Sequence, residues 1–128
     1  MNRLTLPLVT AVALGGALGS VARYAVGVWL ARAGGTFPVA TLLINVTGSF
    51  LIGLFARLFE APDANPVLRA ALTVGLCGGF TTFSTFSAET IALLQQGRAA
   101  RAAVYVTVSI VAGVLATFAG LLLGRTAR

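Results

Sequence analysis

Four long runs of apolar residues dominate the sequence and limit what it can fold into more than any other feature. The runs cover residues 4–30, 39–59, 68–94 and 102–123. A helix needs about 20 apolar residues to cross the hydrocarbon core of a bilayer, and each run reaches that length. The connecting segments are too short to hold a soluble domain. We therefore predict an all-α integral membrane protein whose four transmembrane helices form one domain over residues 1–128.

The first run has an alternative interpretation as a secretory signal peptide, because Arg3 precedes it. The apolar part of a signal peptide spans about 7–15 residues. The run over residues 4–30 is longer than that. A mature transmembrane helix is therefore the better interpretation.

Charged residues are scarce and widely spaced, and this excludes several classes of protein. Nine basic and three acidic residues give a net charge of +6. The basic residues are all Arg and occur one or two at a time, so they form no basic patch and we predict no nucleic-acid partner. Histidine is absent and there is one cysteine, which removes the commonest general base and any multi-cysteine metal site. No nucleophile–base pair is evident, and we predict that the protein is not an enzyme.

The arginines also bear on how the chain crosses the membrane. Four spans place both termini on one side. That side would carry Arg3, Arg57, Arg69, Arg125 and Arg128, and the other side Arg32, Arg98 and Arg101. Because the positive-inside rule needs a clear excess of Lys and Arg, two arrangements remain open. One is a single orientation, and the other is insertion both ways up to give an antiparallel homodimer with its two-fold axis in the membrane plane.

Polar residues inside the apolar runs are informative because they are costly in hydrocarbon. In the first run, Gly15, Gly19, Arg23 and Gly27 recur every four residues. The pair Gly15 and Gly19 favours close packing against another helix. Arg23 is expected to face an aqueous vestibule or a partner, with extension to the nearer membrane surface as the alternative.

Two other runs carry narrow polar faces, again with a four-residue spacing. These faces consist of Thr41, Asn45 and Ser49 in the second run, and of Tyr105, Ser109, Gly113 and Thr117 in the fourth. Asn45 is suited either to donating to an ion in a pore or to an interhelical hydrogen bond. A Ser or Thr hydroxyl can instead bond to a carbonyl of its own helix. That explanation suits a single hydroxyl better than an aligned set.

The third run contains the most unusual segment, GLCGGFTTFSTFSAE over residues 75–89. Gly78 and Gly79 are poor residues for a helix interior, so we predict a break in this helix near the membrane centre. Non-helical backbone at that depth must be buried in protein or line a wet cavity. A break exposes carbonyl groups that suit a cation at one half-helix end and N–H groups that suit an anion at the other.

Aromatic and titratable residues surround the predicted break. Phe80, Phe83 and Phe86 recur every three residues and are expected to share one face. Their ring edges carry partial positive charge and can contact an anion, although spacing alone favours plain helix packing. Glu89, the only acid within a span, either couples protons in a transporter or accepts hydrogen bonds near a helix end. Cys77 is expected to be a small packing residue.

The segment GGFTTFSTFS resembles the Fluc/CrcB family of fluoride channels. The motifs LGSVARY around Arg23 and TLLINVTGSFLIG around Asn45 also resemble it, as does the face with Tyr105 and Ser109. The resemblance covers nearly the whole chain. It implies a small dual-topology homodimer in a bacterial inner membrane, which lets fluoride leave the cytoplasm passively and so reduces fluoride toxicity.

The resemblance further implies roles for individual residues. The expected fluoride pathway consists of Phe83, Phe86, Asn45, Tyr105, Ser109, Thr82, Ser84 and Arg23. The backbone carbonyls of Gly78 and Thr81 from both subunits are expected to hold a structural Na⁺ that is not transported. Hydroxyls further along the fourth run vary within the family, and Gly113 stands here where a hydroxyl would be expected.

Two other functions fit parts of the sequence. A small multidrug-type transporter also has four short spans and exchanges protons for a cationic substrate, for which Glu89 is the available acid. A membrane scaffold without transport activity would account for the glycine face. It gives no reason for three aligned polar rows.

Overall fold

The computed structural model describes residues 5–32 and 34–126. The elements are α1 (Thr5–Ala31), α2 (Val39–Leu58), α3 (Pro66–Ala70), the π-helical segment η1 (Ala71–Cys77), α4 (Gly78–Phe80), α5 (Phe83–Gln95) and α6 (Ala99–Thr126). Four stretches are long and apolar enough to cross a membrane: Thr5–Ala31, Val39–Leu58, Pro66–Gln95 and Ala99–Thr126. The prediction of four transmembrane helices is confirmed. Arg3, Leu4 and Arg128 lie outside the described residues.

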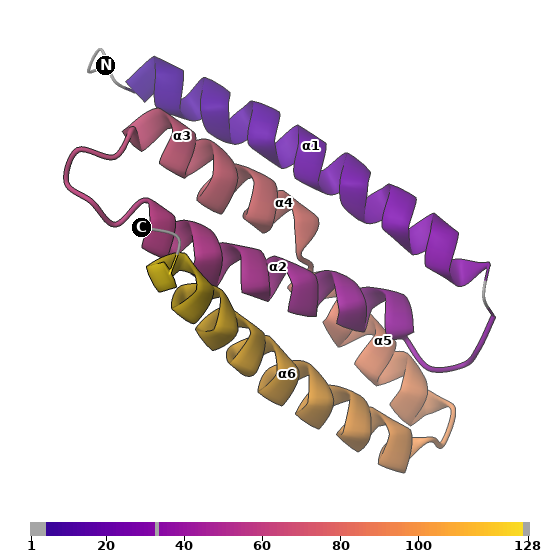
Figure 1. Ribbon diagram of the computed structural model, residues 1–128. Helices are drawn as coiled ribbons and strands as arrows, with labels where there is room; N and C mark the ends of the chain where they lie inside the picture. The colour runs from indigo at the N-terminus through magenta and orange to yellow at the C-terminus, as the bar shows by residue number, and fades with distance from the viewer. Residues whose placement is uncertain (1–4, 33, 127–128) are drawn as a thin grey trace.

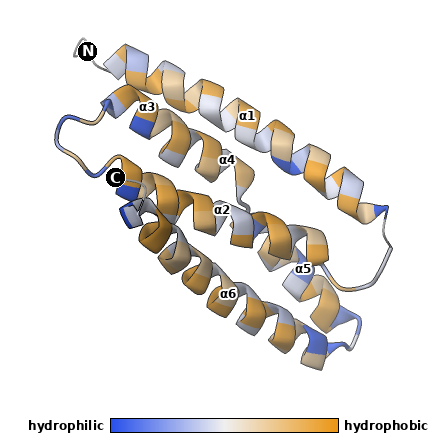
Figure 2. Ribbon diagram, viewed as in Figure 1, coloured by the Kyte–Doolittle hydropathy of each residue, from blue (hydrophilic) through white to orange (hydrophobic). Residues whose placement is uncertain are grey.

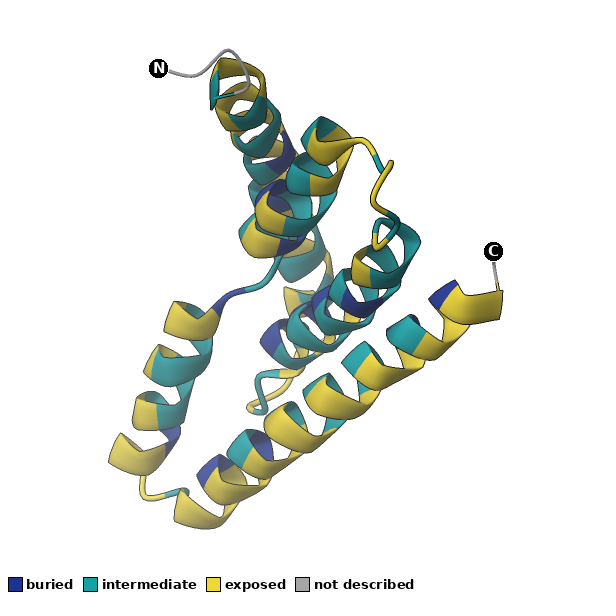
Figure 3. Ribbon diagram, turned by 90° about the vertical axis from the view of Figure 1, so that its left-hand side faces the viewer, coloured by how far each residue is buried: buried dark blue, intermediate teal, exposed yellow. Residues whose placement is uncertain are grey.

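The bundle consists of two helix pairs that the third span connects. In one pair α1 packs along α3, η1 and α4, and in the other α2 packs along α6. After the break, α5 leaves the first pair and packs on α6. Figure 1 shows this change of partner, and Figure 3 shows the short non-helical link at which it occurs. The third span is therefore shared between the two halves of the molecule.

Glycines bring these helices into backbone contact. A Cβ atom added to Gly19 of α1 would lie 2.8 Å from the backbone nitrogen of Phe80 in α4. A Cβ atom added to Gly120 of α6 would lie 2.7 Å from the backbone nitrogen of Leu54 in α2. Both distances are too short for a real side chain. Gly15 and Gly19 are buried, which confirms that this face of the first helix serves helix packing.

The break in the third span is present, but the sequence-based reason for its position was wrong. Gly78 and Gly79 are helical, and the helix ends only after Phe80. Thr81 (φ −77°, ψ 159°) and Thr82 (φ −149°, ψ 111°) are extended. Thr82 then starts α5 as its N-cap, with its Oγ1 accepting from the Thr85 N–H at 3.2 Å. Tertiary contacts override the weak helix preference of glycine, and a capping side chain sets where the helix restarts.

The segment η1 was not expected from the apolar pattern. Its wider turns, with hydrogen bonds five residues apart, are uncommon and often lie next to functional sites. Gly75 within it approaches α1 closely, since an added Cβ would lie 2.9 Å from the Val12 carbonyl oxygen. Cys77 at its end is buried, with 3% of its surface exposed, as expected for a packing residue.

The outer surface of the bundle is apolar. On α1, for example, Leu14 is 63% exposed and Leu18 67% exposed. Figure 2 shows hydrophobic colour along the helices, with the hydrophilic colour concentrated at helix ends and in loops. Such a surface suits lipid rather than water as the solvent.

Candidate functional site

A cavity of about 400 Å³ opens beside the break. Its walls come from α2, from the third span on both sides of the break, and from α6. The lining residues are Asn45, Gly48, Ser49, Ile52, Thr73, Cys77, Gly78, Thr81, Thr82, Phe83, Phe86, Ser109 and Ile110. The structure thus brings together seven of the ten predicted site residues, whereas Arg23, Ser84 and Tyr105 lie outside this lining.

Asn45 holds the extended link in place. Its Oδ1 accepts from the Thr82 N–H at 2.8 Å, and its Nδ2 donates to the Thr82 carbonyl oxygen at 3.1 Å. The carboxamide therefore pairs with both backbone groups of one residue, much as a neighbouring strand would. Nδ2 carries a second N–H, and Asn45 lines the cavity. The interhelical role is observed, and one donor is left for a ligand.

The carbonyl groups of Gly78 and Thr81 are released from helical pairing by their neighbours. In a continuous helix, Gly78 O would accept from the Thr82 N–H and Thr81 O from the Thr85 N–H. The first of these N–H groups donates to Asn45 Oδ1, and the second donates to Thr82 Oγ1. Both residues line the cavity, and a backbone carbonyl without a helical donor is a suitable ligand for a hard cation.

Several hydroxyl groups within the spans are already engaged. Thr117 donates to Gly113 O at 3.1 Å, Ser87 to Phe83 O at 3.0 Å and Thr81 to Cys77 O at 2.9 Å. These are bonds to their own helices. Ser109 differs, because its Oγ is buried and has no hydrogen-bond partner among the described residues. A buried hydroxyl without a partner is costly unless a ligand or water satisfies it.

Ser84 belongs to a small hydroxyl network at the start of α5. Its Oγ lies 3.2 Å from Thr82 Oγ1. The same Thr82 oxygen lies 3.0 Å from Thr85 Oγ1. This network stabilises the helix start next to the cavity.

Two phenylalanines form an aromatic wall. The ring centroids of Phe83 and Phe86 are 5.6 Å apart at an angle of 43°. Phe83 is 78% exposed. The prediction that Phe80 shares their face was wrong, because Phe80 ends the helix before the break while the other two belong to α5.

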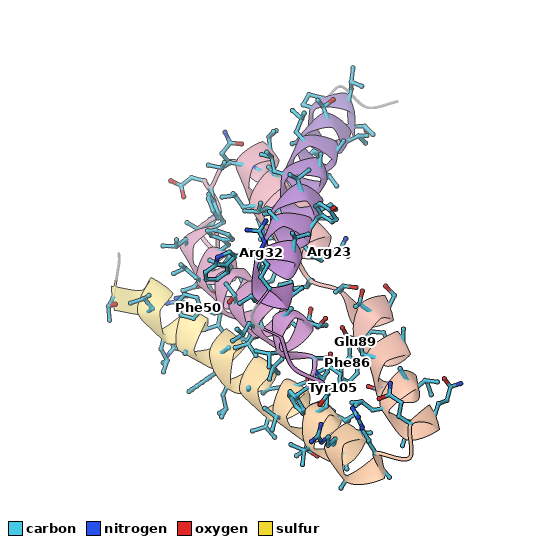
Figure 4. All side chains as sticks on the ribbon, turned by 90° about the vertical axis from the view of Figure 1, so that its right-hand side faces the viewer. Arg23, Arg32, Phe50, Phe86, Glu89 and Tyr105 are labelled. Atoms are coloured by element: carbon cyan, nitrogen blue, oxygen red, sulfur yellow. The ribbon has the colours of Figure 1, made fainter. Side chains whose placement is uncertain are left out.

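Glu89 accepts two hydrogen bonds from other helices. Thr41 of α2 donates to its Oε1 at 2.9 Å, and Tyr105 of α6 donates to its Oε2 at 2.7 Å. Tyr105 is fully buried, and its ring centroid lies 5.2 Å from that of Phe86. Figure 4 shows Phe86, Glu89 and Tyr105 gathered where α5 meets α6. The Tyr105 hydroxyl therefore serves this contact rather than the cavity, and Glu89 joins three helices.

Arg23 turns toward the break from α1. Its Nε donates to the Gly79 carbonyl oxygen at 3.1 Å, beside a longer contact of 3.4 Å from Ser20 Oγ. That carbonyl lies near the C-terminal end of the first half of the span, where a cation is favourable. Arg23 thus stabilises the helix end.

Ser49 is a cavity residue whose part in the site was not predicted from the resemblance. Its Oγ would lie 3.5 Å from a Cβ atom added to Gly113. Gly113 is the position in the α6 row at which the resemblance led us to expect a hydroxyl. In this chain the Ser49 hydroxyl of α2 lies opposite Gly113, where the α6 row has no hydroxyl. This placement is apparent only from how the two helices pack.

Comparison with known proteins agrees with this architecture. The profile of the family described as CrcB-like protein, Camphor Resistance (CrcB), matches residues 10–121. The chain belongs to this family. It is 52% identical over 122 residues to the fluoride-specific ion channel FluC of Nitrobacter winogradskyi (strain ATCC 25391 / DSM 10237 / CIP 104748 / NCIMB 11846 / Nb-255), covering 91% of this chain and 94% of that protein. It is 51% identical over 116 residues to FluC of Rhizobium meliloti (strain 1021), covering 89% and 93%.

Membership of the CrcB-like family agrees with two features of the chain. The four apolar helices make it a multi-pass membrane protein. The relatives are ion channels by name, so the family is one of channels and not of enzymes, as predicted from the residues. The resemblance seen in residues 78–87 is confirmed over most of the chain.

Proposed function

We propose that this protein is a passive, fluoride-selective channel that lets fluoride leave a bacterial cell across the inner membrane. The similar proteins are named fluoride-specific ion channels. The observation that carries the proposal in this chain is the buried Ser109 hydroxyl without a described partner. Ser109 lines a cavity together with Asn45, Phe83 and Phe86.

Neutral groups of this kind suit a small anion. Fluoride is tightly hydrated, so a pore must replace its water with good donors and still release it. Hydroxyl and amide N–H groups donate, and phenyl edges offer partial positive charge without a fixed cation. A membrane potential of 100 mV contributes about 2.3 kcal/mol per charge, which favours anion exit from a negative cell interior without a pump.

The expected pathway extends beyond the cavity. Ser84 supplies a hydroxyl at the start of α5, next to that of Thr82 in the cavity lining. Tyr105 contributes its ring edge beside Phe86. Arg23 supplies positive charge near the break.

We also propose an antiparallel homodimer of this single transmembrane domain. Phe83, on the wall of the cavity, is 78% exposed in one copy. A second copy would cover it and close the cavity. The nearly even distribution of arginines supports insertion both ways up.

A structural Na⁺ fits the residues at the break. Within residues 5–32 and 34–126 no group of three His, Cys, Asp or Glu side chains could hold a metal ion, so backbone oxygens would have to. The carbonyls of Gly78 and Thr81, freed from helical donors, are suited to this, with the same pair from a second copy completing the set. When bound, the cation would lower the cost of placing an anion in a low-dielectric interior.

The direct test is fluoride efflux from liposomes that contain the purified protein. With an imposed potential, we expect fluoride release with little chloride release, measured by ion-selective electrodes. Release that requires a proton gradient would overturn the channel proposal. Release of chloride at an equal rate would overturn the selectivity.

Ser109→Ala tests whether the buried Ser109 hydroxyl contributes to the fluoride pathway. We expect fluoride efflux to fall about tenfold, because one donor to the ion is lost and such a bond contributes about 1.5 kcal/mol. The thermal midpoint should stay level or rise, since the buried hydroxyl has no described partner to lose and is itself costly when unsatisfied. Thr117→Val is the matched control, because the Thr117 hydroxyl bonds to its own helix. Equal efflux from both variants would exclude Ser109 from the pathway.

Phe83→Ile tests the aromatic wall. Isoleucine keeps the side chain apolar but has no ring edge, so we expect fluoride efflux to fall at least tenfold. A tenfold fall corresponds to a rise of about 1.4 kcal/mol in the free-energy barrier to permeation. Size-exclusion chromatography should show the same oligomer as the unchanged protein. Normal efflux from this variant would contradict a role for the ring.

The alternative of a proton-coupled transporter depends on Glu89, and Glu89→Gln tests it. The carboxylate accepts from Thr41 and Tyr105, and glutamine has only one oxygen acceptor. One hydroxyl then loses its acceptor, so we expect a loss of about 1–3 kcal/mol in stability, measured as a lower thermal midpoint. Fluoride efflux should remain independent of a pH gradient. Proton-driven uptake of a cationic dye that this variant abolishes would favour the transporter.

A further inference from the structure

A second cavity, of about 360 Å³, lies at the opposite end of the bundle from the α1–α2 loop. Its lining residues are Ala56, Arg57, Glu60, Arg69, Phe118, Leu121, Leu122 and Arg125. They come from the end of α2, from α3 and from the last turns of α6 (Figure 1). None of them lines the cavity beside the break.

The charges in this cavity do not balance. Three guanidinium groups face one carboxylate, and Glu60 is held by Arg57 in a salt bridge. Among residues 5–32 and 34–126 this is the one salt bridge present. Arg69 and Arg125, both exposed, therefore have no ion pair with a described carboxylate. The cavity has an excess of positive charge and is suited to an anion.

Helix ends explain only part of this charge. Arg57 and Arg125 lie in the last turns of α2 and α6, where a cation offsets the partial negative charge of the terminal carbonyls. Arg69 has no such role, because α3 continues without interruption into η1. Its presence in the cavity calls for another explanation.

The rest of the lining identifies the kind of anion. Phe118, Leu121 and Leu122 precede Arg125 by up to two turns of α6, so they reach about 10 Å deeper toward the membrane centre. Phe118 is 57% exposed and Leu122 42% exposed. A molecule that meets the arginines at the helix ends thus meets an open apolar wall directly below. Figure 2 shows the hydrophilic colour on α3 and at the neighbouring ends of α2 and α6, with hydrophobic colour further along α6.

We propose that this cavity binds the phosphate group of an anionic phospholipid, with an acyl chain along Phe118 and Leu122. Arginine binds phosphate through two parallel N–H···O bonds, and basic pockets between transmembrane helices suit anionic headgroups. Free inorganic phosphate shares the headgroup chemistry but would leave the apolar wall unused. The site does not depend on the proposed fluoride pathway.

The test measures lipid binding to the protein in detergent by native mass spectrometry. Phosphatidylglycerol is the probe, and phosphatidylcholine and inorganic phosphate are the comparators. We expect the dissociation constant for phosphatidylglycerol to be at least about tenfold lower than that for phosphatidylcholine. Inorganic phosphate at equal concentration should not displace it. Equal binding of the two lipids would overturn the proposal, and displacement by inorganic phosphate would show that the site takes the free ion.

Two variants with the same loss of charge localise the site. Arg69→Gln should weaken phosphatidylglycerol binding about tenfold. Arg32→Gln, at the other end of the bundle, should leave it within about twofold. Equal effects of the two would mean that net charge alone attracts the lipid and would overturn the site. Should Arg69→Gln fail to fold, Arg125→Lys must weaken binding while keeping the charge, because lysine lacks the planar fork; unchanged binding in that variant would equally overturn it.

Discussion

Replacing Asn45 with aspartate is expected to reduce fluoride efflux about a hundredfold or more. Aspartate can still accept from the Thr82 N–H but can no longer donate to the Thr82 carbonyl, a bond of 3.1 Å in the structure. Losing a buried donor costs about 1–3 kcal/mol. A fixed negative charge on the cavity wall also repels an anion strongly at low dielectric. Efflux from liposomes measures the combined effect.

The matched control makes the same chemical change outside the cavity. Asn65 is the N-cap of α3, and its Oδ1 accepts from the N–H groups of Val67 and Leu68 at 2.9 and 3.2 Å. Aspartate is an equally good N-cap, so Asn65→Asp should leave efflux unchanged. Asn45→Asp should still assemble, because the contacts of α1 with η1 and of α2 with α6 do not require this side chain. Efflux from Asn45→Asp equal to that of the control would exclude Asn45 from the pathway.

Gly19→Ala is expected to have the largest effect on stability. The new Cβ would lie 2.8 Å from the backbone nitrogen of Phe80, and backbone cannot move aside as a side chain can. Overpacking of this kind costs about 3 kcal/mol, which corresponds to a fall of roughly 10 °C in the thermal midpoint. Because α4 ends at the break, efflux should fall as well.

Gly27→Ala on the same helix provides the comparison. Nothing lies within 4 Å of a Cβ atom added at Gly27. Alanine has the higher helix propensity, by about 1 kcal/mol, so the thermal midpoint should stay level or rise. Of the two identical substitutions on α1, only Gly19→Ala is therefore expected to lower the thermal midpoint. Equal effects would contradict the close contact between α1 and α4.

The sequence predicted which residues form the candidate site better than it predicted how they are arranged. Asn45, Phe83, Phe86 and Ser109 were named from two polar faces and one unusual segment, and they do meet at one cavity. The four-residue spacing places residues on one side of a helix but does not say what that side contacts. Tyr105 shows the difference, since its hydroxyl donates to Glu89.

The position of the break shows why local propensity was not enough. The glycine pair has the weakest helix preference in the segment, yet both residues stay helical, and α1 packs closely against Gly79. The helix ends at Thr81 and Thr82, because Asn45, 37 residues earlier in the chain, takes the backbone bonds of Thr82. Long-range hydrogen bonds of this kind leave no mark in a local pattern.

The sequence by itself determined the four spans, the polar faces and the family. The spans follow from local composition, because a bilayer of given thickness selects apolar runs of a given length. The polar faces follow from a four-residue spacing, and the family from the resemblance of the sequence motifs. Tertiary structure alone decided where the third helix breaks, which carbonyls it frees and which hydroxyl remains without a partner. It also decided that Glu89 joins α5 to Thr41, 48 residues away. These outcomes depend on which donor meets which acceptor across helices, and only the packed bundle determines that.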